Sequence, residues 1–281
     1  MVDVVKYEAA MTDQLRELMR ALEDEIRKLI NLPPSDTRAI RMQNALKARE
    51  QIAAVINRAG ALYEDEAARA AIILAVDTIQ ESDILPDGFA PDVAQEIDAA
   101  ISGRFKELSQ AFGEMSDNVN KTLMRGAVAG LPTEEIAQQI SKDLGKSEAV
   151  GRTVTTTALH SASRAALVDT ADETGADFVY AYVGPLDVKT RPFCRFYGFP
   201  DGGGSKVAYT REALRVMSQD PTQQNQPGGE MGDVSAALGG YNCRHGLAPI
   251  FIEEAIEEGY EIRDAEAVAQ LIAGGGAAVL K

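Results

Sequence analysis

The chain has 281 residues and 45% of them are hydrophobic, so it is long enough for two ordinary domains and apolar enough to exclude global disorder. Tryptophan is absent and aromatic residues make up only 6% of the chain, a composition that favours packed helices over a β-sandwich. The formal net charge is -15 and both halves of the sequence are acidic, which argues against a nucleic-acid clamp and leaves contact with DNA an open question.

The sequence carries no sign of membrane insertion. No run approaches the ~20 consecutive apolar residues that a membrane helix needs, and the N-terminal segment lacks the apolar core of a signal peptide. The two cysteines, Cys194 and Cys243, are too few for a disulfide scaffold, and this usage fits assembly in a reducing cytoplasm. We therefore expect a protein with no membrane span.

Residues 1–147 are predicted to form a long helical region. Apolar residues within Met11–Ile30 recur at the spacing of a helix with one buried stripe, and Pro33–Pro34 would stop this helix. A second helix follows, which Gly60 would end or bend, and a helix rich in alanine and isoleucine is expected over about Asp65–Gln80.

Two more helices are expected before the end of this region. Asp92 would cap a long helix that runs to about Val128. The Gly130–Thr133 segment then breaks the helical pattern, because glycine and proline interrupt it there. Thr133 and the acidic residues after it begin a short helix, which Gly145 would end.

The pattern changes in the second half of the chain. A helix is predicted over Glu148–Gly175, and the β-formers of Phe178–Val183 predict a strand. A short helix over Thr210–Ser218 and a returning strand over Leu247–Ile252 follow. The expected fold class is mainly α with a small α+β C-terminal module: a helical region at 1–147, the module at 148–252 and an acidic helical C-terminal tail at 253–281.

The most informative residues lie between Asp187 and His245. The predicted strand is followed by a D-x-K-T-R-x-x-C turn, then by a variable insert, then by G-Y-N-C-R-H and the second strand. The motif residues are Asp187, Lys189, Thr190, Arg191 and Cys194 in the first part, and Asn242, Cys243, Arg244 and His245 in the second.

This combination resembles the C-terminal module of the phage Mu F-like head morphogenesis proteins, also called minor head or minor capsid proteins. In that family a helix and a strand precede the same kind of cysteine-containing turn, and a late motif of the type N/G-C-R-C/H closes the module. The resemblance covers residues 152–250, about a third of the chain. Arg152 and Thr153 match an Arg-Thr-Glu triplet that many members carry on the preceding helix, but Val154 replaces its glutamate.

The resemblance implies a structural protein and not an enzyme. It implies a bacteriophage virion protein, present in few copies, that associates with the portal protein and the capsid proteins and acts in head morphogenesis, capsid assembly or genome delivery. Such a protein would be assembled in the host cytoplasm and located in the virion head, and it would be free to form a homo-oligomer. The rival interpretations are a nuclease- or toxin-like effector packaged in the virion and an adaptor at the head–tail junction.

The cysteines and the nearby histidine allow three interpretations. Cys194, Cys243 and His245 would supply two thiolates and an imidazole to a zinc ion. His160 or Asp187 would then be the fourth ligand, although the tight C-x2-C pairs of ordinary zinc sites are missing. Alternatively, the two cysteines would join two loops, either reduced or as a disulfide that stabilises the fold by about 3–4 kcal/mol. The third interpretation is two unrelated free thiols, and the favoured expectation is no cofactor.

Residues 187–245 form a long stretch that is not acidic, with seven Lys and Arg against six Asp and Glu. The basic motif residues in this stretch are Lys189, Arg191, Arg195 and Arg244. They would bind a phosphate or carboxylate, or would pair with Asp187 and hold the turn, which is the favoured hypothesis.

His160 and His245, with Arg191 and Arg244, would supply the acid–base pair and the phosphate-binding groups of a nuclease. His160, however, lies on a helix face rich in Thr and Ser, where a structural histidine is commoner.

Overall fold

The protein is described here by a computed structural model that covers residues 4–30, 32–33, 37–81, 91–204, 206–220, 233–240 and 243–276, with only the backbone for residues 38 and 91–106. The expected fold class is confirmed, because the chain is mainly helical and its small sheet lies in the C-terminal part. Two compact units are present. The helical unit comprises Val5–Ala70 and Gly103–Thr155, and the sheet unit comprises Met1–Val4, Ala71–Ser102 and Thr156–Lys281.

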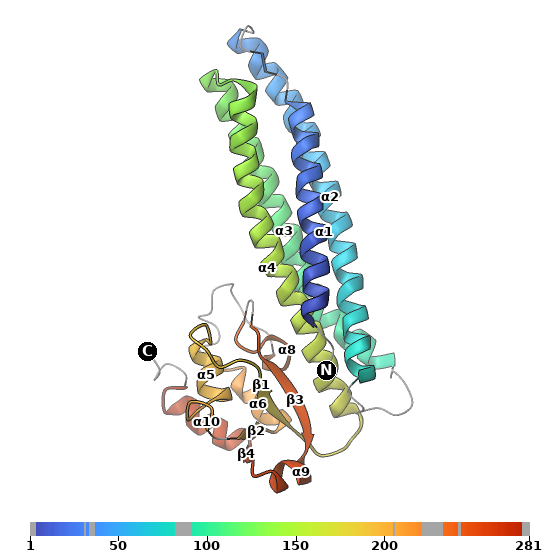
Figure 1. Cartoon of the computed structure of the whole chain (residues 1–281), viewed down its shortest axis with the longest axis vertical. Coiled ribbons are helices and arrows are strands. Elements are labelled where there is room, and N and C mark those ends of the chain that lie inside the picture. Colours follow the sequence, from blue (N-terminus) through green and yellow to red (C-terminus); the bar gives the residue numbers. More distant parts are fainter. Residues whose placement is uncertain are drawn as a thin grey trace. The chain divides into compact units, whose positions relative to one another are not determined.

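Four long helices contribute to the helical unit: α1 (Val4–Leu29), α2 (Arg38–Glu81), α3 (Pro91–Ala129) and α4 (Thr133–Glu173). They lie side by side and alternate in direction along the bundle (Figure 1). In the described part of the chain, none of the helices combines the length and the hydrophobicity needed to cross a bilayer. Helix α1 shows the expected single buried stripe, made of Met11, Leu15, Met19, Leu22 and Ile26.

The observed helix boundaries differ slightly from the predicted ones. Helix α1 ends at Leu29, ahead of the expected stop at Pro33, and Pro34 lies outside the described residues. Helix α3 begins at Pro91, one residue before the expected cap Asp92, because the fixed φ of proline suits the first position of a helix. The break before Thr133 is confirmed.

Gly60, which was expected to end or bend a helix, and Gly145, which was expected to end one, both lie inside longer helices. Gly60 lies within α2, where an added Cβ atom would meet the Phe112 ring at 2.7 Å, so the missing side chain lets α3 approach closely. Gly145 lies within α4, so the two helices expected on either side of it are one. Packing along a whole helix outweighs the ~1 kcal/mol that one interior glycine costs.

A buried arginine fixes the connections at one end of the helical unit. The Arg41 guanidinium donates to the carbonyl oxygens of Leu32 and Pro33 over 2.8 and 3.0 Å. It also donates to the carbonyl of Leu131, just before α4 begins. One side chain therefore satisfies carbonyl groups of two connecting segments that lie far apart in sequence.

The described part of the sheet unit contains four strands in the order β3-β1-β2-β4. Strand β1 (Phe178–Val183) pairs antiparallel with β3 (Gly246–Phe251) and with β2 (Val207–Tyr209), and β2 pairs in parallel with β4 (Glu261–Arg263). The predictions of β1 and β3 are confirmed. Strands β2 and β4 were not predicted, because three residues are too few to show an alternating pattern.

Short helices accompany these strands: α5 (Pro192–Gly198), α6 (Arg211–Met217), α8 (Val234–Ala237), α9 (Ile252–Glu257) and α10 (Ala265–Ala273). The prediction of α6 is confirmed, and Thr210 caps it by accepting from the Ala213 N–H. Helix α10 packs against α6, and β4 belongs to the sheet. The residues after 252, expected to form a separate acidic helical tail, therefore complete the fold of the module, because β4 pairs with β2 and α10 buries Val268.

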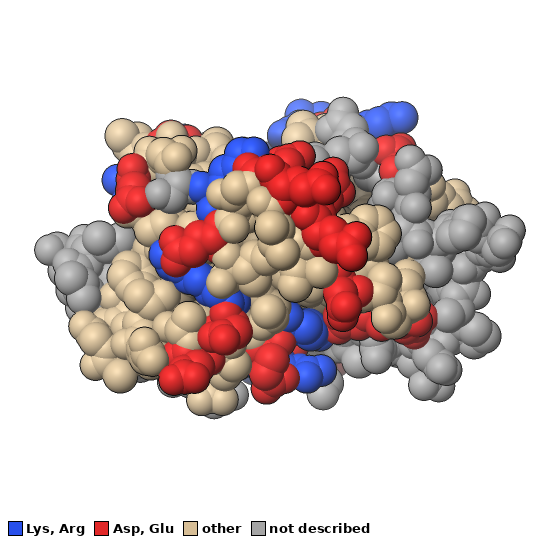
Figure 2. Space-filling view, turned by 90° about the horizontal axis from the view of Figure 1, so that it is seen from below, with Lys and Arg blue, Asp and Glu red and all other residues tan. Residues whose placement is uncertain are grey.

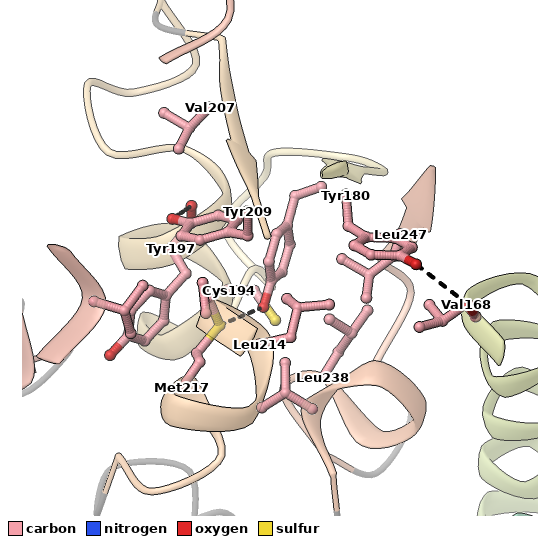
Figure 3. Packing of buried hydrophobic residues seen from close by; sticks show 14 of the residues in the cluster. Val168, Tyr180, Cys194, Tyr197, Val207, Tyr209, Leu214, Met217, Leu238 and Leu247 are labelled. Carbon is pink, nitrogen blue, oxygen red and sulfur yellow. Dashed lines mark hydrogen bonds between the residues drawn. The ribbon is translucent and has the colours of Figure 1, made fainter. Parts of the chain in front are cut away.

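The main core of the sheet unit lies on one face of the sheet, where buried tyrosines surround Cys194 (Figure 3). The Tyr209 hydroxyl donates to the carbonyl of Tyr197 over 2.6 Å, and the Tyr197 hydroxyl donates to the buried Asp220 carboxylate over 2.5 Å. Burial raises the pKa of both hydroxyls well above the usual range of tyrosine, so both stay protonated. Hydrogen-bonded tyrosines thus form the layer on which the motif residues rest.

Candidate functional site

The two separated parts of the motif meet in an ion pair. The Arg244 guanidinium donates to both carboxylate oxygens of Asp187, over 2.9 and 2.7 Å. These hydrogen bonds from Arg244 are the main reason that the pKa of Asp187 lies well below its usual range. Of the basic motif residues that were expected to pair with Asp187, Arg244 forms an ion pair with its carboxylate.

Asp187 also organises the turn that leads into α5. One of its carboxylate oxygens accepts from the Lys189 N–H over 2.8 Å, and its backbone N–H donates to the Thr190 hydroxyl over 2.9 Å. The Thr190 hydroxyl in turn donates to the Pro185 carbonyl over 3.0 Å. A motif of the type D-x-x-T can fold this way because both side chains reach backbone groups two or three residues away. We call residues 185–190, which form this turn, together with Cys243–His245, the motif knot.

Two more arginines of the motif are also engaged within the chain. Arg191 donates to the carbonyl of Gly239, and Arg195 donates to the carbonyl of Asp187 over 2.9 Å. Pro192 provides the first residue of α5, and Arg191 stands at its N-cap position. These contacts connect α5 to the turn before it and to the segment that follows α8.

Cys194, Cys243 and His245 lie together beneath this surface. The two sulfur atoms are 3.5 Å apart and unbonded, and the Cys243 sulfur is 3.5 Å from Nδ1 of His245. The two sulfur atoms and one ring nitrogen of His245 all lie within 4.8 Å of one another. All three side chains are buried. Helix α5 supplies Cys194, whereas the other two residues come from the segment that leads into β3.

The thiols are electrostatically unequal. Their mutual hydrogen bond is the main cause of both shifts: it raises the pKa of the Cys194 thiol and lowers the pKa of Cys243. The nearby charge of Arg164 also favours a thiolate at Cys243. Negative charge in this pair therefore resides on Cys243.

The histidine ring is held from its other side. Nε2 of His245 lies 3.0 Å from the carbonyl oxygen of Pro185. Gly184, with φ 136°, passes so close that an added Cβ atom would lie 3.0 Å from the Cα atom of His245. The ring is therefore fixed between the Gly184–Pro185 backbone and the thiol of Cys243.

Arg164 of α4 is a further site residue that sequence reasoning missed. Its buried guanidinium donates to the carbonyls of His245 and Ala236, over 2.9 and 3.0 Å, and to the carbonyl of Cys243. One signal was available: it stands in the helical run SASRAALV, whose small residues Ala162, Ala165 and Ala166 mark a buried face. An arginine on such a face requires buried acceptors.

Some predicted site residues do not join the cluster of thiols and imidazole. Neither His160 nor Asp187 is a member of that group among the described residues, and the Asp187 carboxylate is engaged by Arg244. Asn242 lies outside the described residues. The Lys189 side chain is exposed, and its contribution to the turn is its backbone N–H.

No protein-family model, curated protein or solved structure matches this chain.

Proposed function

We propose that this chain is a structural minor head protein of a tailed bacteriophage, associated with the portal or the inner capsid and active in head morphogenesis or genome delivery. The observation that carries the proposal is the pairing of Asp187 with Arg244. The two parts of the motif that resembles the head morphogenesis family are distant in sequence, yet they form one knot. This convergence supports the resemblance, because residues that match a family pattern by chance have no reason to meet.

A structural role fits the state of the motif residues better than catalysis does. An acid–base catalyst must reach its substrate, but His245 is buried and both of its ring nitrogens face groups of the same chain. Arg191 donates to the carbonyl of Gly239 and Arg244 donates to the carboxylate of Asp187, so both guanidinium groups are engaged within the chain. The knot is therefore suited to hold a module in shape, and the partner contacts would be made by other surfaces.

The long helices offer such surfaces. Within the helical unit, Leu62 is 63% exposed and Leu46 is 48% exposed, although neighbouring positions of α2 are buried. Apolar side chains outside the buried stripe of a helix are available to a protein partner. The face drawn in Figure 2 is seen from below the view of Figure 1 and is not the side of the long helices. It carries acidic side chains with smaller basic areas between them, which on that face favours protein partners over the nucleic-acid backbone.

The test is genetic complementation in the phage or prophage that carries this gene. Deletion of the gene is expected to abolish or sharply reduce infectious particles, and the wild-type gene supplied in trans is expected to restore them. Asp187→Ala should restore them poorly because it opens the knot, whereas the matched turn variant Lys189→Ala should restore them fully. Normal yields of infectious particles after deletion would contradict the proposal.

A nuclease assay separates this proposal from its main rival. We expect the purified full chain to leave RNA and DNA intact. Cleavage that disappears with His245→Ala would favour a packaged effector instead, and labelling of the chain at the neck rather than in the head would favour a head–tail adaptor.

A further inference from the structure

We propose that Cys194, Cys243 and His245 bind a zinc ion, which links helix α5 to the segment that leads into β3. The inference stands independently of the proposed function, because it rests on the arrangement of three buried side chains. These residues include both cysteines of the chain and one of its two histidines. Each residue type is a preferred zinc ligand.

The distances suit a tetrahedral ion. Zinc bonds of about 2.3 Å to sulfur and about 2.0–2.1 Å to nitrogen place two sulfur ligands about 3.8 Å apart, and a sulfur and a nitrogen about 3.6 Å apart. The sulfur atoms of Cys194 and Cys243 are 3.5 Å apart, and the Cys243 sulfur is 3.5 Å from Nδ1 of His245. A disulfide would require the sulfur atoms to approach to about 2.0 Å. Two of the three ligand pairs are thus within a few tenths of an ångström of the distances expected for zinc, and the third pair, the Cys194 sulfur and the His245 nitrogen, lies within 4.8 Å.

The contact of His245 with Pro185 selects the ring nitrogen that would bind the metal. A carbonyl oxygen can only accept a hydrogen bond, so the 3.0 Å contact between Nε2 and the Pro185 carbonyl assigns the ring proton to Nε2. In the neutral ring, Nδ1 then carries a lone pair directed at the Cys243 thiol. Zinc-binding histidines are commonly held in this way, by a hydrogen bond from the second ring nitrogen to a carbonyl or carboxylate.

The backbone around the three side chains is fixed before any ion binds. The Arg164 guanidinium holds the carbonyls of both Cys243 and His245. Gly239 passes so close that an added Cβ atom would lie 2.4 Å from the Cys194 sulfur and 3.5 Å from the Cys243 sulfur.

The three residues leave one position of a tetrahedral ion open, which we assign to a water molecule. Binding requires both sulfurs as thiolates, so each thiol that is protonated releases its proton to solvent, while the neutral imidazole releases none. No oxidant or reductant takes part. X-ray absorption at the zinc edge is therefore expected to show two sulfur ligands and two nitrogen or oxygen ligands.

The first test measures zinc content by elemental mass spectrometry. The full chain is expressed in zinc-supplemented medium and purified under reducing conditions. We expect one zinc ion per chain in the wild type. Cys194→Ser, Cys243→Ser and His245→Gln should each lose the metal. His160→Gln is the matched control, because it removes the other histidine of the chain, and it should retain the metal. Retention of zinc by His245→Gln at the wild-type level would overturn the assignment.

A second test uses only the wild-type chain, so it does not depend on the folding of any variant. Zinc is removed with a chelator, circular dichroism verifies that the chain is folded, and Co²⁺ is added as a spectroscopic substitute. Thiolate-to-cobalt charge-transfer absorption and the strong visible bands of tetrahedral cobalt are expected at one equivalent. Folded, reduced protein that binds neither metal, and whose two thiols are alkylated equally fast with and without zinc, would overturn the proposal.

Discussion

Asp187 and Arg244 lie 57 positions apart in the sequence, yet the Arg244 guanidinium meets both carboxylate oxygens of Asp187. The pair is also exposed, since the two side chains retain 40% and 41% of their accessible surface. Solvent weakens ion pairs between exposed side chains, so this pair adds only modestly to stability. Its main effect is to determine which two segments of the chain contact each other.

Replacing Asp187 should make the free energy of unfolding less sensitive to a fall in pH. The lowered pKa of Asp187 means that its carboxylate stays ionised to lower pH in the folded chain than in the unfolded chain. Its stabilising effect is therefore complete above the ordinary pKa of an aspartate and is lost as the pH falls below it. Urea titrations from neutral to acidic pH should show this loss in the wild type and a smaller one in Asp187→Asn.

Lys189→Ala serves as the control, because the Lys189 side chain is exposed and only its backbone N–H contacts Asp187. It should follow the wild-type pH dependence. An unchanged pH dependence in Asp187→Asn would contradict the role assigned to the ion pair.

Arg164→Met should be among the most destabilising substitutions in the sheet unit. It leaves the buried carbonyl groups of His245 and Cys243 and the partly buried carbonyl group of Ala236 without their donor. An unsatisfied buried group costs about 1–3 kcal/mol before relaxation, so we expect the free energy of unfolding, measured by chemical denaturation, to fall by about 2–5 kcal/mol in total. Arg152→Ala, an exposed arginine of the same helix, should change stability by less than about 0.5 kcal/mol. Equal destabilisation by the two variants would contradict the role of Arg164 as the donor to these carbonyl groups.

Gly145 and Gly60 provide opposite tests of helix continuity. An added Cβ atom at Gly145 meets nothing within 4 Å, so Gly145→Ala should stabilise the chain by about 0.5–1 kcal/mol, as alanine does within a helix. At Gly60 the same atom meets the Phe112 ring, so Gly60→Ala should destabilise by about 1–3 kcal/mol. Thermal unfolding of the two variants measures these changes in stability. Destabilisation by Gly145→Ala would indicate that α4 is interrupted at this position.

Gly239→Ala should disturb the thiol pair specifically. Its Cβ atom would lie 2.4 Å from the Cys194 sulfur, so the two cysteines must separate or the segment after α8 must shift. We expect a loss of about 1–3 kcal/mol in stability and faster alkylation of both thiols. Gly113→Ala, whose Cβ atom meets nothing within 4 Å, should leave thiol reactivity unchanged. The same alkylation rate in both variants would argue against the close approach at Gly239.

The sequence allowed the main elements to be predicted where their patterns are long. The stripe of α1 and the β-rich segment Phe178–Val183 are strong periodic or compositional signals, and both were found. The helix ends predicted at Gly60 and Gly145 were wrong because propensity is a local preference, whereas the helices persist through packing against distant residues such as Phe112. Strand β4 was missed because its pairing with β2 depends on the whole module and not on its own three residues.

The motif residues could be identified from the sequence, but their arrangement could not. A shared site of Cys194, Cys243 and His245 was one of three interpretations of the sequence, and the structure places these residues in one cluster. The sequence left the partner of Asp187 open and indicated no role for Arg164. A single arginine in a helix looks like a surface residue until the segment that it contacts, here from Ala236 to His245, is placed beside it.

The most direct test of the proposed function is quantitative mass spectrometry of purified, nuclease-treated virions from the phage that carries this gene. We expect peptides of this chain in heads purified away from tails, at a few copies per portal ring. We also expect the purified chain to bind the purified portal. Virions that contain portal and capsid proteins but none of this chain, together with no binding to the portal, would show that the proposed function is wrong.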